Sequence, residues 1–102
     1  MDKMKEMQAL LKKIPRGKVT TYRELSHALG THGYRYVGQL LNKNPEPDKF
    51  PCYKVVKADG SLGGFAMGST EKIRRLKADG IVIKQGEIVD FPSKLYKFFI
   101  QH

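Results

Sequence analysis

The segment 21–42 carries the clearest local structural signals of the chain, and they predict two short helices joined by a tight turn. Thr21 can cap the first helix, over 22–29, and Glu24 stands where a capping box requires an acidic side chain. A glycine follows this helix, and a short loop leads to a second helix over 34–42. Two short helices around a glycine-containing turn are typical of a helix-turn-helix, whose second helix contacts DNA.

Other patterns predict elements on both sides of this motif. Apolar residues spaced three and four apart predict an amphipathic helix over 4–14, which Pro15 ends. A β-hairpin that follows a helix-turn-helix is the wing of a winged-helix domain. We therefore expect a small α/β, winged-helix-like domain with short strands and a C-terminal β-hairpin wing. The further predicted elements are an extended segment at 18–20, a buried turn and short strand within 50–56, a hairpin turn at 59–60, a glycine-rich loop over 61–68, a helix over 69–78 and the β-hairpin over 81–89.

Length and composition exclude several classes of protein. A chain of 102 residues is one domain by the usual prior, so 1–102 is expected to form a single domain. No apolar run approaches the roughly 18 residues of a membrane span, and the charged N-terminus lacks the apolar stretch of a secretion signal. One cysteine cannot form an internal disulfide. We expect a monomer without a membrane partner, in the cytoplasm or, in a eukaryote, the nucleus.

The net charge gives the first indication of a partner. Nineteen Lys and Arg residues against ten Asp and Glu residues leave a formal charge of +9. The excess is spread along the chain and is not confined to one tail. Such a charge attracts polyanions and is typical of a nucleic-acid-binding protein. A basic surface that serves only solubility is the alternative interpretation.

Cys52 is the candidate for chemistry. Pro51 fixes the backbone just before the thiol, and the flanking Lys49 and Lys54 would favour the thiolate, which is the form that attacks electrophiles. The alternative is a small buried hydrophobic residue, which is what most free cysteines are. The three histidines are scattered, so the residues indicate neither a metal site nor a cysteine–histidine hydrolase, and no cofactor is expected.

Five segments carry a resemblance to a known family. In chain order they resemble the DNA-binding and active-site domain of O6-alkylguanine-DNA alkyltransferases and the related alkyltransferase-like proteins. The resemblance extends over about 14–80, and the N-terminal domain of most full-length members has no counterpart here. The segments are IPRGKVTTY at 14–22, RYVG at 35–38, NP at 44–45, PCYKVV at 51–56 and GSLGGF at 60–65.

The resemblance implies a DNA repair mechanism. The domain would enter the minor groove of duplex DNA and rotate an alkylated guanine into a pocket. Cys52 would then take the alkyl group irreversibly, so each protein would act once. Tyr22 matches the tyrosine that helps to rotate the nucleotide and protonates the departing guanine. Arg35 matches the arginine that fills the gap in the base stack, and Asn44 matches the asparagine that braces the active-site turn.

The resemblance also assigns residues to the DNA interface and to the base pocket. Each assignment has a structural alternative: Tyr22 could only pack, Arg35 could bind a phosphate or lie free on the surface, Asn44 could only form a turn, and Phe65 could belong to the core. The assigned DNA-binding residues are Tyr22, Tyr34, Arg35, Gly38, Asn44 and Lys54, and the assigned pocket residues are Pro51, Val55, Gly64, Phe65 and Ala66.

Three positions of the active site, Tyr53, Lys54 and Asp79, depart from the family pattern. Tyr53 and Lys54 stand where the family has histidine and arginine, and Asp79 replaces the glutamate that supports the histidine. A phenol, with a pKa of about 10, relays protons less well at neutral pH than an imidazole at about 6.5. One hypothesis is a compensated Cys52–Tyr53–Asp79 relay, and its opposite is a weakened site with slow or selective transfer.

Three functions follow as alternatives. The preferred one is a methylated-DNA–protein-cysteine methyltransferase that acts on duplex DNA containing alkylated guanine. The second is a non-enzymatic lesion sensor that holds the flipped base for other repair proteins, although alkyltransferase-like proteins usually have tryptophan where this chain has Cys52. The third is a winged-helix transcription regulator in which Cys52 is a core residue.

Overall fold

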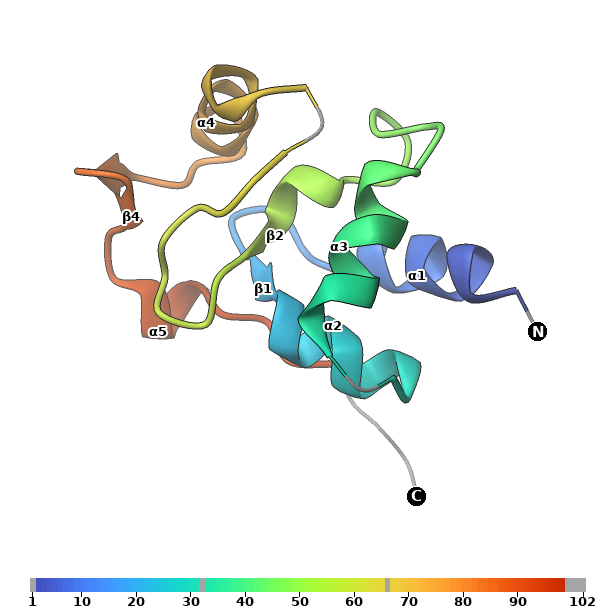
Figure 1. The fold of residues 1–102 in the computed structure, drawn as a ribbon. Helices are drawn as coiled ribbons and strands as arrows, with labels where there is room; N and C mark the ends of the chain where they lie inside the picture. The colour runs from blue at the N-terminus through green and yellow to red at the C-terminus, as the bar shows by residue number, and fades with distance from the viewer. Residues whose placement is uncertain (1, 32, 66, 99–102) are drawn as a thin grey trace.

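Three helices from the first half of the chain pack together on one side of the molecule (Figure 1). The computed structural model describes residues 2–31, 33–65 and 67–98. Helix α2 contacts both α1 and α3. The elements in chain order are α1 (Lys3–Leu11), β1 (Thr20–Thr21), α2 (Tyr22–Leu29), α3 (Tyr34–Asn42), the 3₁₀ turn η1 (Cys52–Lys54), β2 (Val55–Val56), α4 (Ser69–Ala78), β3 (Ile83–Lys84), β4 (Glu87–Ile88) and α5 (Phe91–Lys94).

The two helices of the predicted helix-turn-helix have the predicted boundaries. The Thr21 side chain accepts a hydrogen bond from the Glu24 backbone N–H at 3.0 Å, which caps the start of α2. Gly30 follows α2 with a left-handed φ of 69°, a conformation that glycine adopts without strain. Helix α3 begins and ends where the sequence predicts.

Helix α1 is shorter than the predicted 4–14 segment, and this is a correction. Its last α-helical residue is Leu11, and the Lys13 and Ile14 backbone N–H groups then bond to the carbonyls of Leu10 and Leu11. These bonds tighten the chain into a final turn. Ile14 is still buried, so the apolar periodicity marks the buried face and extends beyond the end of the helix.

A parallel strand pair separates two hydrophobic cores. Thr20 pairs with Val55 and Thr21 pairs with Val56. Because neighbouring strand residues point to opposite faces, Val55 joins the core of the three helices and Val56 joins a second core. The first core comprises Met7, Leu11, Ile14, Leu25, Leu29, Val37, Leu41, Cys52, Val55 and Phe98, and the second comprises Val19, Val56, Leu62, Leu76, Ile81 and Ile88.

The second half of the chain forms a helix and a hairpin around the second core. Strands β3 and β4 are antiparallel, and Gln85 and Gly86 between them both have positive φ angles, as a two-residue hairpin turn requires. The predicted C-terminal hairpin and the α/β class are therefore confirmed. The turn at 59–60 also forms, but β2 pairs with β1, so this turn does not join paired strands as predicted.

Among the described residues, no helix combines the length and apolar character that crossing a membrane requires.

Candidate functional site

Cys52 lies at a cavity between α3 and the glycine-rich segment. The cavity has a volume of about 70 Å³, and the Cys52 side chain at its base is buried. One wall comes from α3, which packs on the first core, and the other comes from the loop that precedes α4. The residues that line it are Tyr22, Gly38, Leu41, Asn42, Cys52, Gly64 and Phe65.

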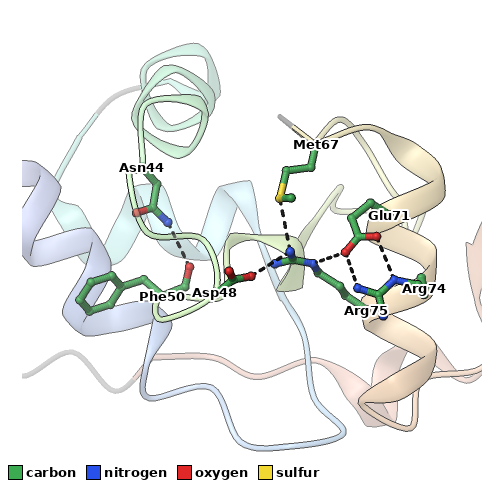
Figure 2. A network of polar contacts seen from close by, with 7 residues as sticks. All are labelled: Asn44, Asp48, Phe50, Met67, Glu71, Arg74 and Arg75. Atoms are coloured by element: carbon green, nitrogen blue, oxygen red, sulfur yellow. Dashed lines mark hydrogen bonds and ion pairs between the residues drawn. The ribbon is translucent and has the colours of Figure 1, made fainter.

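Asn44 braces the turn that presents the thiol. Its amide Nδ2 donates to the Phe50 carbonyl at 3.0 Å (Figure 2), and the same carbonyl accepts from the Cys52 backbone N–H at 2.8 Å. Its Oδ1 accepts from the Glu46 backbone N–H at 3.1 Å and from Gln8 Nε2 at 3.2 Å. Because these bonds bury the Asn44 side chain, its assignment to the DNA interface is corrected: it contacts the active-site turn.

The charges around the Cys52 thiol differ from those that the sequence suggests. Burial raises the pKa of Cys52, while the hydrogen bond from Asn44 and the charges of Lys72 and Arg75 lower it. Lys49, in contrast, directs its ammonium group over the Phe50 ring, 5.4 Å from the centroid. The cations that favour the thiolate therefore come from α4, and not from the sequence neighbours of Cys52.

Tyr22 stands at the opposite side of the cavity from the turn. Its hydroxyl donates to the Gly64 carbonyl at 3.4 Å, and its pKa is raised by burial and by Cys52. Gly63 has a φ of 72°, and a Cβ there would lie 3.0 Å from the Tyr22 hydroxyl oxygen. A side chain at this position would displace the tyrosine, so the glycine is required for the close approach.

Lys72 is a site residue that the sequence interpretation missed. Its side chain is fully buried, and its ammonium group donates to the Val55 carbonyl at 2.7 Å and to the Gly64 carbonyl at 2.9 Å. Burial lowers the pKa of Lys72 to about 8, against the opposing effect of Cys52. The available signal was its position: Lys72 precedes Leu76 by four residues, on the buried face of α4.

Lys54 and Asp79 form a buried ion pair away from the cavity. Lys54 Nζ lies 2.9 Å from Asp79 Oδ2 and also donates to the Pro15 carbonyl at 2.9 Å. The same Asp79 oxygen accepts from the Gly17 backbone N–H at 2.8 Å. Lys54 is only 4% exposed. Its ammonium group contacts Asp79 and the Pro15 carbonyl inside the fold, so its assignment to the DNA interface is wrong.

The hydrogen bonds of the hypothesised Cys52–Tyr53–Asp79 relay do not form in this structure. Asp79 is engaged by Lys54 and by the backbone, and Tyr53 packs its ring against the second core. Within the described residues, the Tyr53 hydroxyl has no hydrogen-bond partner. Burial and the charge of Asp79 raise its pKa, so Tyr53 remains a neutral phenol beside this ion pair.

The base-pocket assignments are only partly matched by the cavity. Gly64 and Phe65 line it. Pro51 and Val55 do not: Pro51 lines a separate surface hollow beside Tyr53, and Val55 is fully buried in the first core, so their assignment to the base pocket stays a prediction. Ala66 lies outside the described residues.

A wider basic hollow continues from the cavity to the surface. Its volume is about 530 Å³, and it shares Tyr22, Gly38 and Gly64 with the Cys52 cavity. Tyr34 is 54% exposed and Arg35 is exposed at the start of α3. The remaining lining residues are Arg23, Lys57, Ala58 and Gly63. The described residues contain no group of three or more His, Cys, Asp or Glu side chains that could hold a metal ion.

Comparison with known proteins gives a consistent set of similarities. Residues 2–81 match the family model described as 6-O-methylguanine DNA methyltransferase, DNA binding domain. A bifunctional methyltransferase/endonuclease of Picrophilus torridus is 47% identical over 93 residues, which are 90% of this chain and 30% of that protein. The chain thus spans less than a third of the length of this curated relative.

Two solved structures have a similar fold. The O6-methylguanine-DNA methyltransferase of Pyrococcus kodakaraensis is 36% identical with a TM-score of 0.72, and the match covers 79% of this chain and 47% of that one. Atl1 of S. pombe, in complex with damaged DNA containing O6-carboxymethylguanine, is 27% identical with a TM-score of 0.80. That match covers 93% of this chain and 94% of that one.

Proposed function

We propose that this chain, which belongs to the family of the 6-O-methylguanine DNA methyltransferase DNA-binding domain, binds duplex DNA containing an O6-alkylated guanine and transfers the alkyl group to Cys52. The family predicted from the five sequence segments is thereby confirmed. The observation that carries the proposal is the position of the thiol, at the base of a cavity that opens into a basic surface hollow.

The charge of the surface supports the binding of DNA. The formal charge is +9, and Arg23, Arg35 and Lys57 line the hollow. Cations that neutralise phosphates release counterions, so affinity should fall steeply as salt increases. Arg35 is exposed at the start of α3, where its side chain can occupy the space that a rotated guanine leaves in the duplex.

Two groups that line the cavity, the Cys52 thiol and the Tyr22 hydroxyl, account for the bonds and protons of the transfer step. The Cys52 thiol loses its proton, and its sulfur forms a bond to the alkyl carbon as the bond from that carbon to guanine O6 breaks. The electron pair remains on the base, and the Tyr22 hydroxyl donates a proton to it. The proton from Cys52 then restores the tyrosine hydroxyl. A raised pKa keeps Tyr22 protonated and able to donate, and the Lys72 charge favours the thiolate.

A second candidate function is a lesion sensor that holds the flipped base without accepting its alkyl group. Two observations favour it. Tyr53 and Asp79 do not form the expected relay, and burial raises the pKa of Cys52, which disfavours the reactive thiolate.

Intact-mass measurement separates the two functions. The protein is incubated with a duplex that carries one O6-methylguanine, and the mass of the protein is then recorded. Transfer predicts a gain of one methylene group, which Cys52→Ser abolishes. A sensor would bind this duplex more tightly than the undamaged one and leave the mass unchanged. Equal affinity for both duplexes, without a mass change, would contradict both functions.

A further inference from the structure

Arg75 contacts residues of three segments, namely the loop before Cys52, the segment before α4, and α4 itself (Figure 2). Its guanidinium group lies 2.8 Å from Asp48 Oδ1 in the loop before Cys52, and it donates to Glu71 Oε2 at 2.6 Å within α4. It also donates to the Met67 sulfur at 3.4 Å. The Arg75 side chain is 13% exposed, so these contacts hold it in a single, mostly buried position.

The same guanidinium group supports the wall of the Cys52 cavity. It lies 5.7 Å from the centroid of the Phe65 ring, within the range of a cation–π contact. Phe65 and Gly64 form the loop side of the cavity. Arg75 therefore joins this loop side to the Asp48 loop on one flank and to α4 on the other.

The size of the cavity limits which O6 substituent fits beside the thiol unless a wall moves. The cavity measures about 70 Å³, whereas a protein cavity that holds benzene is on the order of 150 Å³. The guanine itself can lie in the adjoining hollow of about 530 Å³, but a benzyl group on O6 needs space next to Cys52. The α3 side is anchored in the first core by Val37 and Leu41, which are buried. On the loop side, Phe65 is only partly buried against this core and the other contacts are polar, so this is the side that can be displaced.

We propose that Arg75 determines specificity, because its contacts with Asp48 and Phe65 hold the loop side of the cavity inward and so limit the size of the O6 substituent that enters. The inference rests on the proposed function, since it concerns which alkylated guanines that site accepts. Arg75 is a positioning residue: it acts through Phe65. A bulky substituent displaces Phe65 further than a methyl group does, so it works against more of the Arg75 contacts.

The test compares binding of two lesions by matched variants. Duplexes carry one O6-methylguanine, one O6-benzylguanine or an unmodified guanine, and the dissociation constant of each is measured at one salt concentration. All proteins compared, including the reference, carry Cys52→Ser, so that transfer cannot consume the lesion during the measurement. Arg75→Gln removes the guanidinium group and with it the contacts to Asp48 and Phe65. Asp48→Asn removes only the charge of the Asp48 side chain, which is 87% exposed. Arg74→Gln is the matched control, because Arg74 shares the Glu71 carboxylate but is 67% exposed and has no contact with Asp48 or Phe65 among those described.

The measured quantity is the affinity for the benzyl lesion relative to that for the methyl lesion. We expect this ratio to rise about fivefold in Arg75→Gln, as for the loss of coupled contacts, and about twofold in Asp48→Asn, because an exposed ion pair is weak. Arg74→Gln and Asp48→Glu should leave it unchanged, the latter because the carboxylate is retained.

Three results would overturn the proposal. In the first, the ratio is unchanged in Arg75→Gln. In the second, binding of all three duplexes falls by the same factor, as a purely structural role would predict. If Arg75→Gln does not fold, an unchanged ratio in folded Asp48→Asn is the third. Failure of the reference protein, which carries Cys52→Ser alone, to prefer either lesion over unmodified guanine would instead contradict the proposed function, and this inference with it.

Discussion

The two walls of the Cys52 cavity are held in place by different kinds of interaction. The α3 wall rests on apolar side chains that are buried in the first core, among them Leu25, Val37 and Leu41. The loop wall carries Gly64 and Phe65. The Phe65 ring is only partly buried against the first core, and the other contacts of this wall come from polar groups, namely the Tyr22 hydroxyl, the Lys72 ammonium group and the Arg75 guanidinium group.

This difference in interactions determines which wall can move when a ligand binds. Apolar packing is dense and non-directional, so displacing α3 would open voids throughout the first core. Hydrogen bonds from a few cations are local, and a bound base can replace them. We infer that α3 keeps its position when DNA binds, while the loop wall adjusts to the base and its substituent.

The largest effect is expected in the packing behind α3. Leu25→Ala removes a fully buried side chain of the first core, and such truncations cost about 3 kcal/mol in the free energy of unfolding. Chemical denaturation should measure this loss, and its size should not depend on salt. The exposed Arg74→Ala serves as the control, with a change of less than about 0.5 kcal/mol. A Leu25→Ala loss below about 1 kcal/mol would contradict the contrast between the walls.

A smaller, pH-dependent effect is expected at the loop wall. The pKa of Lys72 is lowered to about 8 in the folded protein, while an unfolded lysine titrates near 10.5. Between these values the unfolded chain binds more protons, so the folded state gains stability as the pH rises. Relative to Lys72→Met, the wild type should gain about 1.5 kcal/mol of unfolding free energy between pH 8 and 9.5.

The control for this measurement lies on the same helix. Lys77 is exposed on α4, and the difference between the wild type and Lys77→Met should stay constant over this pH range. A constant difference for Lys72→Met as well would mean that Lys72 is not held as a buried cation, and the loop wall would then need another support.

The parts of the fold that the sequence predicts are those set by neighbouring residues. The Thr21 cap and the left-handed Gly30 fix the ends of α2 through contacts within a few residues. The Gln85–Gly86 turn is likewise local. Family resemblance added the Cys52 turn and its brace, Asn44, whose bond to the Phe50 carbonyl spans six positions.

The electrostatics of the site could not be predicted in this way. The Lys54–Asp79 pair and the contacts of Lys72 join segments that only the tertiary fold brings together. Proximity in sequence suggested that Lys54 would activate Cys52, but the chain directs its ammonium group to Asp79. In the same way, Arg75 on α4 contacts Asp48, which lies in the loop before Cys52.

The smallest effect is expected at Tyr53, and it tests whether the hydroxyl of this residue affects the reactivity of the Cys52 thiol. Tyr53 packs on the second core, and the nearby Asp79 carboxylate is occupied by Lys54 and Gly17. Tyr53→Phe should therefore change the rate at which iodoacetamide alkylates Cys52 by less than about twofold at pH 8, because only the thiolate reacts and its supports remain. This reagent reports on the thiol whether the protein is a transferase or a sensor. Lys72→Met is the positive control, since losing the cation should slow alkylation about threefold or more. A comparable loss in Tyr53→Phe would mean that the Tyr53 hydroxyl also activates the thiol, as the hypothesised relay requires, and that the cations of α4 are not its sole support.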